Sequence, residues 1–342
     1  MRTSGDPGRS TGTSSAGPGP TAGAAGWIGV GAVTLGTFTL VTNEFLPVGL
    51  LTSIAAELHV PVGVAGTTVT VPGLVAAAAA PLVTVAVGNL DRRIVLALMS
   101  IAFIVADVLA AFAPNLGVLL LARFALGLGI GGFWAIGASI GGRLDQPVTF
   151  RQLASVPRGA NGRAGLIATL LLVVGNFAAY TFIEPFLVQR TGVSAGMVSV
   201  FLLLYGVAGI VGNFAVGRAL ATRMRPTILV VIAVLGLSVL AMPLLGLSSP
   251  GAFLVLALWG LSYGALPAAM QTWVFTADRI KSEGGSALCI STFQISLALG
   301  ALVGGRIVDA TGVAASMFTG AALAAVAFIA LIALSRPVPA QF

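Results

Sequence analysis

The chain has 342 residues, of which 8% are charged and 57% are apolar, and its formal net charge is +7. Soluble domains carry about 25% charged residues, so this composition excludes a soluble globular protein, which would lack a polar surface. A nucleic-acid-binding domain is also excluded, since it would need a basic soluble surface with interleaved aromatic side chains. We therefore expect an all-α integral membrane protein surrounded by the lipid bilayer.

Ten apolar runs are long enough to cross a bilayer, for which a helix needs about 20 residues. Backbone amides cannot stay unpaired in lipid, and the runs lack the alternation of a membrane β-barrel, so each run is predicted to be a helix. The predicted spans are residues 27–54, 63–88, 94–113, 116–142, 164–188, 196–217, 227–247, 250–276, 285–305 and 313–334.

The basic residues are unevenly distributed between the predicted loops. With the N-terminus in the cytoplasm, all but three of the 17 lysines and arginines lie in cytoplasmic segments. Arg190 and Arg306 fall on the outer side, and Arg123 lies within the fourth span. Because cytoplasmic loops collect basic residues, this distribution predicts a multi-pass protein of the inner membrane with both termini in the cytoplasm.

The polar segments divide the chain into two predicted bundles. Residues 1–25 are rich in Gly, Ser, Thr and Pro, a composition that predicts a disordered tail. A basic segment with two prolines separates the fourth span from the fifth, and residues 148–156 within it are expected to form a short helix on the membrane surface. The predicted organisation is a tail (1–25), an N-terminal bundle of four spans (26–142), a linker (143–163), a C-terminal bundle of six spans (164–336) and a second tail (337–342).

Three segments of the chain carry a resemblance to a known family. They are TNEFLPVGLL (Thr42–Leu51), APNLGVLLLARFALGLGIGGFW (Ala113–Trp134) and GNFAAYTFIEPFL (Gly175–Leu187). These segments resemble the first, fourth and seventh helices of the major facilitator superfamily, and most closely its bacterial drug and sugar efflux branch. The resemblance covers nearly all of residues 27–335, and it implies a transporter that exchanges a small molecule for protons.

The chain departs from that family in its number of spans. The family has twelve spans in two groups of six, whereas this chain has four followed by six, with no counterpart of the family's fifth and sixth helices. We therefore expect the fourth span to expose a glycine-rich face beside Arg123. The N-terminal bundle would then either collapse around Arg123 or recruit a second copy, so a monomer is expected with a dimer as the alternative.

Four charged residues lie within the predicted spans: Glu44, Asp107, Arg123 and Glu184. Each costs about 2.5–3.5 kcal/mol at a helix centre on insertion scales, so such residues usually face a partner or a cavity. Glu44 and Arg123 lie at matching depths, which favours a proton-coupling pair over a static ion pair. Asp107 lies at a similar depth across a tight hairpin, and it is the alternative partner of Arg123.

Further polar and aromatic residues within the spans are candidates for the lining of a substrate cavity. Asn176, Tyr180 and Glu184 are spaced four apart, which predicts one face of the fifth span. Their alternative roles are helix packing or interfacial anchoring, and Glu184 before Pro185 would alternatively cap the outer helix end. The candidates are Asn43, Trp134, Asn176, Tyr180, Glu184, Trp259, Tyr263 and Gln294.

No sequence motif indicates an enzyme or a bound cofactor. A phosphate-binding Gly-x-x-x-x-Gly-Lys-Ser/Thr loop is absent, and Cys289 and His59 are the only cysteine and histidine, which leaves no metal cluster. We therefore expect proton-coupled efflux of a drug-like compound, a sugar or a metabolite. The alternative is a non-transporting remnant, or a membrane interaction protein, derived from such a transporter.

Overall fold

The computed structural model describes residues 24–86, 92–140, 160–277 and 283–334, and their packing divides the chain into two units. Residues up to Val41 form the first unit, whose described part is a single helical segment. Residues from Thr42 onward form the second unit, which contains the candidate site. The predicted tail 337–342 and surface helix 148–156 lie outside the described residues, as do most of the predicted tail 1–25 and of the linker 143–163.

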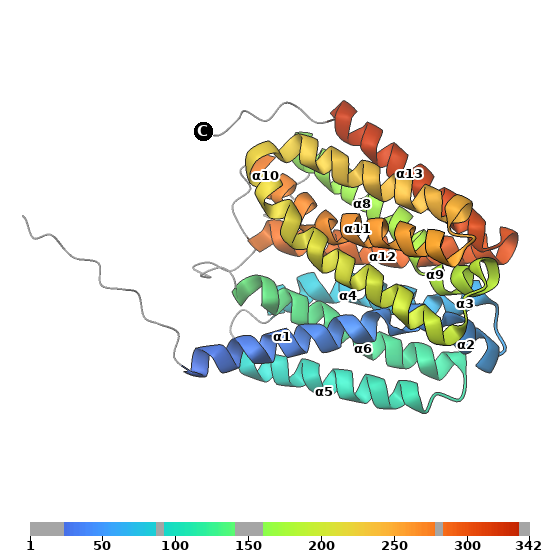
Figure 1. Ribbon diagram of the computed structural model, residues 1–342. Helices are drawn as coiled ribbons and strands as arrows, with labels where there is room; N and C mark the ends of the chain where they lie inside the picture. Colours follow the sequence, from blue (N-terminus) through green and yellow to red (C-terminus); the bar gives the residue numbers. More distant parts are fainter. Residues whose placement is uncertain (1–23, 87–91, 141–159, 278–282, 335–342) are drawn as a thin grey trace, which may run out of the picture. The chain divides into compact units, whose positions relative to one another are not determined.

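Every element in the described ranges is a helix or a helical turn (Figure 1). The long helices are α1 (Ala24–Phe45), α4 (Thr67–Ala86), α5 (Arg92–Ala111), α6 (Leu116–Ile140), α8 (Ala160–Tyr180), α10 (Ala195–Leu245), α11 (Ser249–Ala277), α12 (Glu283–Thr311) and α13 (Val313–Leu334). The short elements are η1 (Leu46–Gly49), α2 (Leu51–Glu57), α3 (Val62–Ala65), α9 (Ile183–Phe186) and η3 (Leu187–Thr191).

The helices of the described residues include seven that are long and apolar enough to cross a membrane, or eight if one bent pair counts as a span. The expected all-helical, multi-pass membrane fold is confirmed. Two differences explain why the structure has eight spans by this count and the sequence predicted ten. The apolar part of α5, Ala97–Ala111, is shorter than a full span, and α10 covers two predicted spans at once.

Helix α10 contains the sixth and seventh predicted spans, residues 196–217 and 227–247. Its 51 residues would extend about 76 Å as one straight helix, far more than the roughly 30 Å of a hydrocarbon core. The backbone leaves the helical conformation at Arg223, and Pro226 follows within one turn. Figure 1 shows the chain turning back at this break, so that the two arms of α10 run in opposite directions.

The first predicted span is broken, because α1 ends at Phe45 and the chain bends by 64° before α2. Pro47 lies in the intervening turn η1, where its missing N–H cannot continue the α-helical ladder. The fifth predicted span is broken in the same way, since α8 ends at Tyr180 and α9 follows after a short turn. Both breaks lie at the predicted outer ends of their spans.

Helix α12 packs against two groups of helices in the second unit. One group contains α4, α5 and α6, and the other contains α8, α10 and α13. Helix α12 itself packs against α4 on one side and against α8 on the other. Helix α4 in turn packs on α6, which packs on α5, while α8 packs on α13 and α13 on α10. The buried apolar core follows this arrangement and includes the large side chains Trp259, Trp273, Phe177 and Phe182.

Four glycines of α6, Gly127, Gly129, Gly131 and Gly132, are covered by neighbouring helices. A Cβ atom on Gly127 would lie 2.7 Å from the Pro72 carbonyl oxygen of α4, and one on Gly129 would lie 2.5 Å from the Phe103 ring of α5. The exposed side of α6 carries Leu121, Phe124 and Leu128 instead. The prediction that this helix exposes a glycine-rich face is therefore wrong, because α4 and α5 occupy that face and leave side chains suited to lipid outside.

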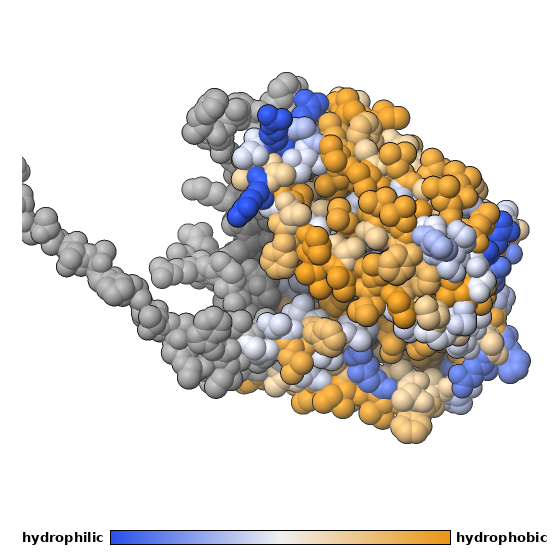
Figure 2. Space-filling model, viewed as in Figure 1, coloured by the Kyte–Doolittle hydropathy of each residue, from blue (hydrophilic) through white to orange (hydrophobic). Residues whose placement is uncertain are grey.

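The outer surface of α10 is strongly apolar. Leu203, Ile210 and Phe214 are 67%, 60% and 79% exposed. Figure 2 shows hydrophobic residues over most of the visible face and hydrophilic residues gathered toward its two ends. This distribution suits a bilayer, in which an apolar side chain is stable facing lipid.

Glycines bring α10 and α11 into backbone contact. A Cβ atom on Gly264 would collide with the backbone of Gly209, and one on Gly212 would collide with the backbone of Leu261. Small residues at such crossings let membrane helices approach closely.

We predict that Gly264→Leu destabilises the protein, because a side chain there must push the two helices apart, and overpacking typically costs about 1–3 kcal/mol. Thermal unfolding in detergent, followed by size-exclusion chromatography, measures the effect. Gly206→Leu is the matched control, since a Cβ atom at Gly206 of α10 meets nothing within 4 Å. Equal midpoints for the two variants would contradict the proposed close contact.

Candidate functional site

The break at the end of α1 exposes a main-chain carbonyl group to a buried arginine. In an α-helix the carbonyl of Asn43 would accept a hydrogen bond from the N–H of residue 47, but residue 47 is proline and has none. Arg123 of α6 takes that place: its Nη1 donates to the Asn43 carbonyl oxygen at 2.8 Å. Arg123 is 8% exposed, so this contact lies in the interior of the second unit.

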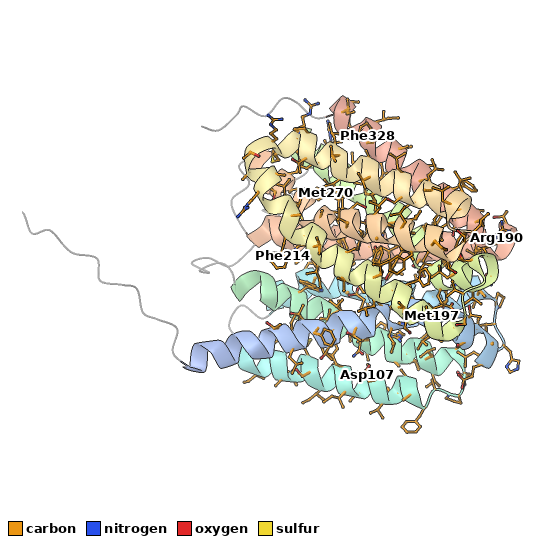
Figure 3. The ribbon with its side chains drawn as sticks, viewed as in Figure 1. Asp107, Arg190, Met197, Phe214, Met270 and Phe328 are labelled. Atoms are coloured by element: carbon orange, nitrogen blue, oxygen red, sulfur yellow. The ribbon has the colours of Figure 1, made fainter. Side chains whose placement is uncertain are left out.

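The side chain of the same asparagine binds an acid. Asn43 Nδ2 donates to Asp107 Oδ2 at 2.7 Å, and Asp107, labelled in Figure 3, lies on α5. Asp107 attracts Arg123 electrostatically, but within the described residues the two form no direct ion pair. Asn43 thus lies between the acid and the base, and it links them through its side chain and its main chain.

Glu44 is separate from this arrangement although it follows Asn43 directly. Its carboxylate is 4% exposed and accepts a hydrogen bond from Gln294 Nε2 of α12 at 3.1 Å. It also lies close enough to Tyr263 to interact with it electrostatically. Glu44 and Asp107 were the two predicted partners of Arg123. In the described part of the chain neither acid forms a direct hydrogen bond with Arg123, and Asp107 is linked to Arg123 through Asn43.

All three tyrosines of the chain meet in one aromatic cluster, which we define as Tyr180, Tyr205, Tyr263, Trp259 and Phe177. The Tyr180 and Tyr205 rings stack with their centroids 4.5 Å apart, and the Tyr205 and Tyr263 rings stack at 6.1 Å. Trp259 presents its edge to Tyr180 and Tyr205, at 6.1 Å from each. Phe177 makes edge contacts with Tyr180 and Tyr263.

Polar groups border the aromatic cluster. Trp259 Nε1 donates to Asn176 Oδ1 at 2.8 Å, and Asn176 is 2% exposed. Glu44 approaches the cluster at Tyr263. Phe45, the next residue along, stacks on Phe177 with the two centroids 5.7 Å apart. The end of α1 therefore contacts both the acid–base residues and the aromatic rings.

Two of the predicted cavity residues lie elsewhere. Trp134 on α6 makes its ring contact, within the described residues, with the neighbouring Phe133. Glu184 does not share a helical face with Asn176 and Tyr180, because α8 ends at Tyr180 before Glu184 is reached. Its carboxylate instead accepts two hydrogen bonds from Thr52.

The sequence analysis missed three members of the site: Pro47, Tyr205 and Phe177. A usable signal existed for two of them. The chain has only three tyrosines, all in apolar spans, and a proline four residues after a polar residue within a helix leaves a free carbonyl. Phe177 carries no such signal, since phenylalanine is common throughout the spans.

The N-terminal part of the chain matches a family model. Residues 33–144 match the model described as the Major Facilitator Superfamily. This segment includes the helix break at Pro47 and both charged residues, Asp107 and Arg123, that Asn43 connects.

Two curated relatives align with most of the chain. The transcription regulatory protein OpdE of Pseudomonas aeruginosa is 28% identical, over 92% of this chain and 95% of that protein. The purine ribonucleoside efflux pump NepI of Escherichia coli is 27% identical, over 84% of this chain and 88% of that protein. The alignment with OpdE runs to 386 positions but covers 92% of the 342 residues of this chain, about 315, so roughly 71 positions of the relative lie opposite gaps.

Two solved structures have a similar fold. The human organic anion transporter MFSD10 superposes with a TM-score of 0.63 at 16% identity, over 88% of this chain and 98% of that one. The fucose:proton symporter FucP of Escherichia coli superposes with a TM-score of 0.56 at 13% identity, over 91% and 100%. At these identities the likeness shows the fold alone.

The contact between Asn43 and Asp107 can be tested by exchanging its two members. We predict that Asn43→Asp lowers the thermal midpoint in detergent, because it places two carboxylates in contact. Asp107→Asn removes the charged acceptor and is expected to lower the midpoint less. The double variant restores one donor and one acceptor, so it is expected to be more stable than Asn43→Asp alone. A double variant whose loss equals the sum of the single losses would contradict the contact.

Proposed function

We propose that this chain, a secondary transporter of the major facilitator superfamily, exports a small molecule across the inner membrane while protons enter. The observation that carries the proposal is the buried carboxylate of Glu44, which is held by Gln294 rather than by a cation. Acids within membrane spans serve in proton relays, since they exist in a charged and a neutral form. The two forms differ in how strongly they accept a hydrogen bond.

The position of Glu44 suits a coupling role. Its bond to Gln294 joins the first predicted span to α12, which belongs to the predicted C-terminal bundle. Protonation weakens the carboxylate as an acceptor, so proton uptake loosens this connection and lets the two groups of helices move. A second donor, Arg123 Nε, is buried and has no hydrogen-bond partner among the described residues, so it is the donor that we propose for the charged form of Glu44.

Asn43 and Pro47 position Arg123 in this scheme. The carbonyl group freed by Pro47 holds the guanidinium group at the end of α1, one residue from Glu44. Asp107 offsets the arginine charge through Asn43 without binding it. Arg123 is thereby free to exchange its carbonyl partner for a carboxylate when Glu44 loses its proton.

The substrate we propose is a small molecule with a flat aromatic ring. The aromatic cluster offers ring faces and edges on which such a ring can stack, and Glu44, Gln294 and Asn176 supply polar groups beside it. The relative NepI is named for purine ribonucleosides, which combine a flat heterocycle with polar groups. Purine ribonucleosides are therefore the first compounds to test.

We predict that Glu44→Gln abolishes the accumulation of labelled inosine or adenosine in everted vesicles driven by a pH gradient. Glutamine keeps the size of the side chain and an acceptor for Gln294, but it cannot carry the proton. Glu57→Gln is the control, because Glu57 is exposed at the end of α2, and it is expected to leave the rate unchanged. Both variants must be present in the membrane in equal amounts.

An unchanged rate and pH dependence for Glu44→Gln would make Glu44 a structural residue. Asp107→Asn would then be the variant to measure, since Asp107 is the other acid that acts on Arg123.

The second candidate is a non-transporting membrane protein derived from such a transporter. The roughly 71 gap positions in the OpdE alignment leave room for two membrane helices of roughly 20 residues each together with their loops, which is consistent with the expected loss of the family's fifth and sixth helices. Vesicles that contain intact protein, yet accumulate no nucleoside, sugar or drug-like compound above the level of empty vesicles, would favour this candidate.

A further inference from the structure

Two carboxylates from the C-terminal helices bind the first turns of two short helices near the N-terminal end of the second unit. Glu184 of α9 accepts hydrogen bonds from the backbone N–H of Thr52 at 3.0 Å and from its hydroxyl group at 2.7 Å. Asp309 of α12 accepts one from the N–H of Gly63 at 2.8 Å. Thr52 lies in the first turn of α2, and Gly63 lies in the first turn of α3.

These bonds supply what α2 and α3 lack. The first amides of a helix have no partner within it, and neither α2 nor α3 has a side-chain cap of its own. Carboxylates suit this position, because the N-terminal end of a helix is electropositive. Both short helices therefore depend on an acid from the other group of helices.

The same region contains a close backbone contact. A Cβ atom on Gly305 of α12 would lie 2.6 Å from the carbonyl oxygen of Gly63, and one on Gly63 would collide with the carbonyl oxygen of Gly305. Nothing larger than hydrogen fits between α3 and α12 at this point. The two groups of helices therefore touch directly, backbone to backbone, beside the bond of Asp309.

The other charged groups of this end do not neutralise the two acids. Glu57 and His59 lie on and beside α2, Arg190 follows α9, and Arg306 lies on α12; all four are exposed. Within the described residues none of them forms an ion pair with Glu184 or Asp309. Both carboxylates thus remain available to the amides of α2 and α3.

We infer that Glu184 and Asp309 act together as a gate that closes the predicted outer side of the transport pathway. The inference rests on the proposed function, since only a transporter needs the two groups of helices to separate there. In the closed state both acids hold helix amides of the opposite group, and Gly63 lies against Gly305. Opening the outer side breaks all three contacts at once.

The gate differs from a pair of independent helix caps in one measurable way. An independent cap protects only its own helix, whereas a shared gate protects both α2 and α3. Two reporter cysteines separate these cases: Ala55→Cys on α2 and Ala65→Cys on α3, where the alanines are 6% and 0% exposed. Each reporter is placed in a Cys289→Ser background, which removes the one native cysteine.

The experiment measures the rate at which a membrane-impermeant maleimide labels each reporter in purified protein in nanodiscs. Glu184→Ala and Asp309→Ala are the test variants, and Glu57→Ala is the control. We expect either test variant to raise the labelling of both reporters roughly tenfold or more, because a charge-assisted hydrogen bond is lost. Labelling raised only at Ala55→Cys by Glu184→Ala, and only at Ala65→Cys by Asp309→Ala, would overturn the gate. So would unchanged labelling throughout.

A second variant keeps the test decisive if loss of an acid prevents folding. Gly305→Val leaves both carboxylates in place but prevents the close approach of α3, so it is expected to raise the labelling of both reporters. Gly196→Val is its control, since a Cβ atom at Gly196 meets nothing within 4 Å. Unchanged labelling in Gly305→Val would contradict the gate. Labelling does not depend on transport, so a wrong substrate or an inactive protein leaves this result readable.

Discussion

Pro47 removes one amide hydrogen from the end of α1, and a buried polar group in a membrane protein must find a partner elsewhere. The carbonyl of Asn43 finds it in Arg123, so the charge with the highest cost of burial is fixed at a gap in the helix ladder. The bend before α2 begins at the same place. One missing hydrogen bond thus determines the direction of the chain and the position of the guanidinium group.

Among the described residues, three polar pairs connect the two groups of helices, and α12 takes part in two of them. Gln294 binds Glu44 at one level of the helix, and Asp309 binds Gly63 near its end. Between these levels the contact is made by small residues and apolar side chains; Gly73 of α4, for example, lies against α12. Separating this surface breaks few hydrogen bonds between the described residues.

Hydrophobic length and charge distribution were sufficient to predict the fold. The tenth span was predicted as residues 313–334, and α13 covers Val313–Leu334. Residues 33–144 also match the model of the family that the sequence was predicted to resemble. The helix breaks were missed, because hydropathy is insensitive to a proline within an apolar run. Glu184 was placed one helix too early for a similar reason, since the turn after Tyr180 consists of Thr181 and Phe182, and a single threonine does not interrupt an apolar run.

The charged and amide residues of the candidate site were predictable from the sequence, but their pairing was not. Glu44, Asp107, Arg123 and Gln294 were all identified from their polarity within apolar spans. Their pairing depends on distances between helices, which a single sequence does not encode. Asn43 is an example. It binds Arg123 through its main-chain carbonyl group, and the type of a residue does not indicate which partner its main-chain carbonyl group will bind.

The concentration of every tyrosine around Trp259 has a spectroscopic consequence. Tyrosine emission overlaps tryptophan absorption, and at centroid distances near 6 Å excitation energy passes from Tyr180 and Tyr205 to the indole ring far faster than it is emitted. The folded protein should therefore emit as if it contained tryptophan alone. Unfolding, which moves these rings far apart, would restore tyrosine emission, and this gives the aromatic cluster an optical signal of its own without any added dye.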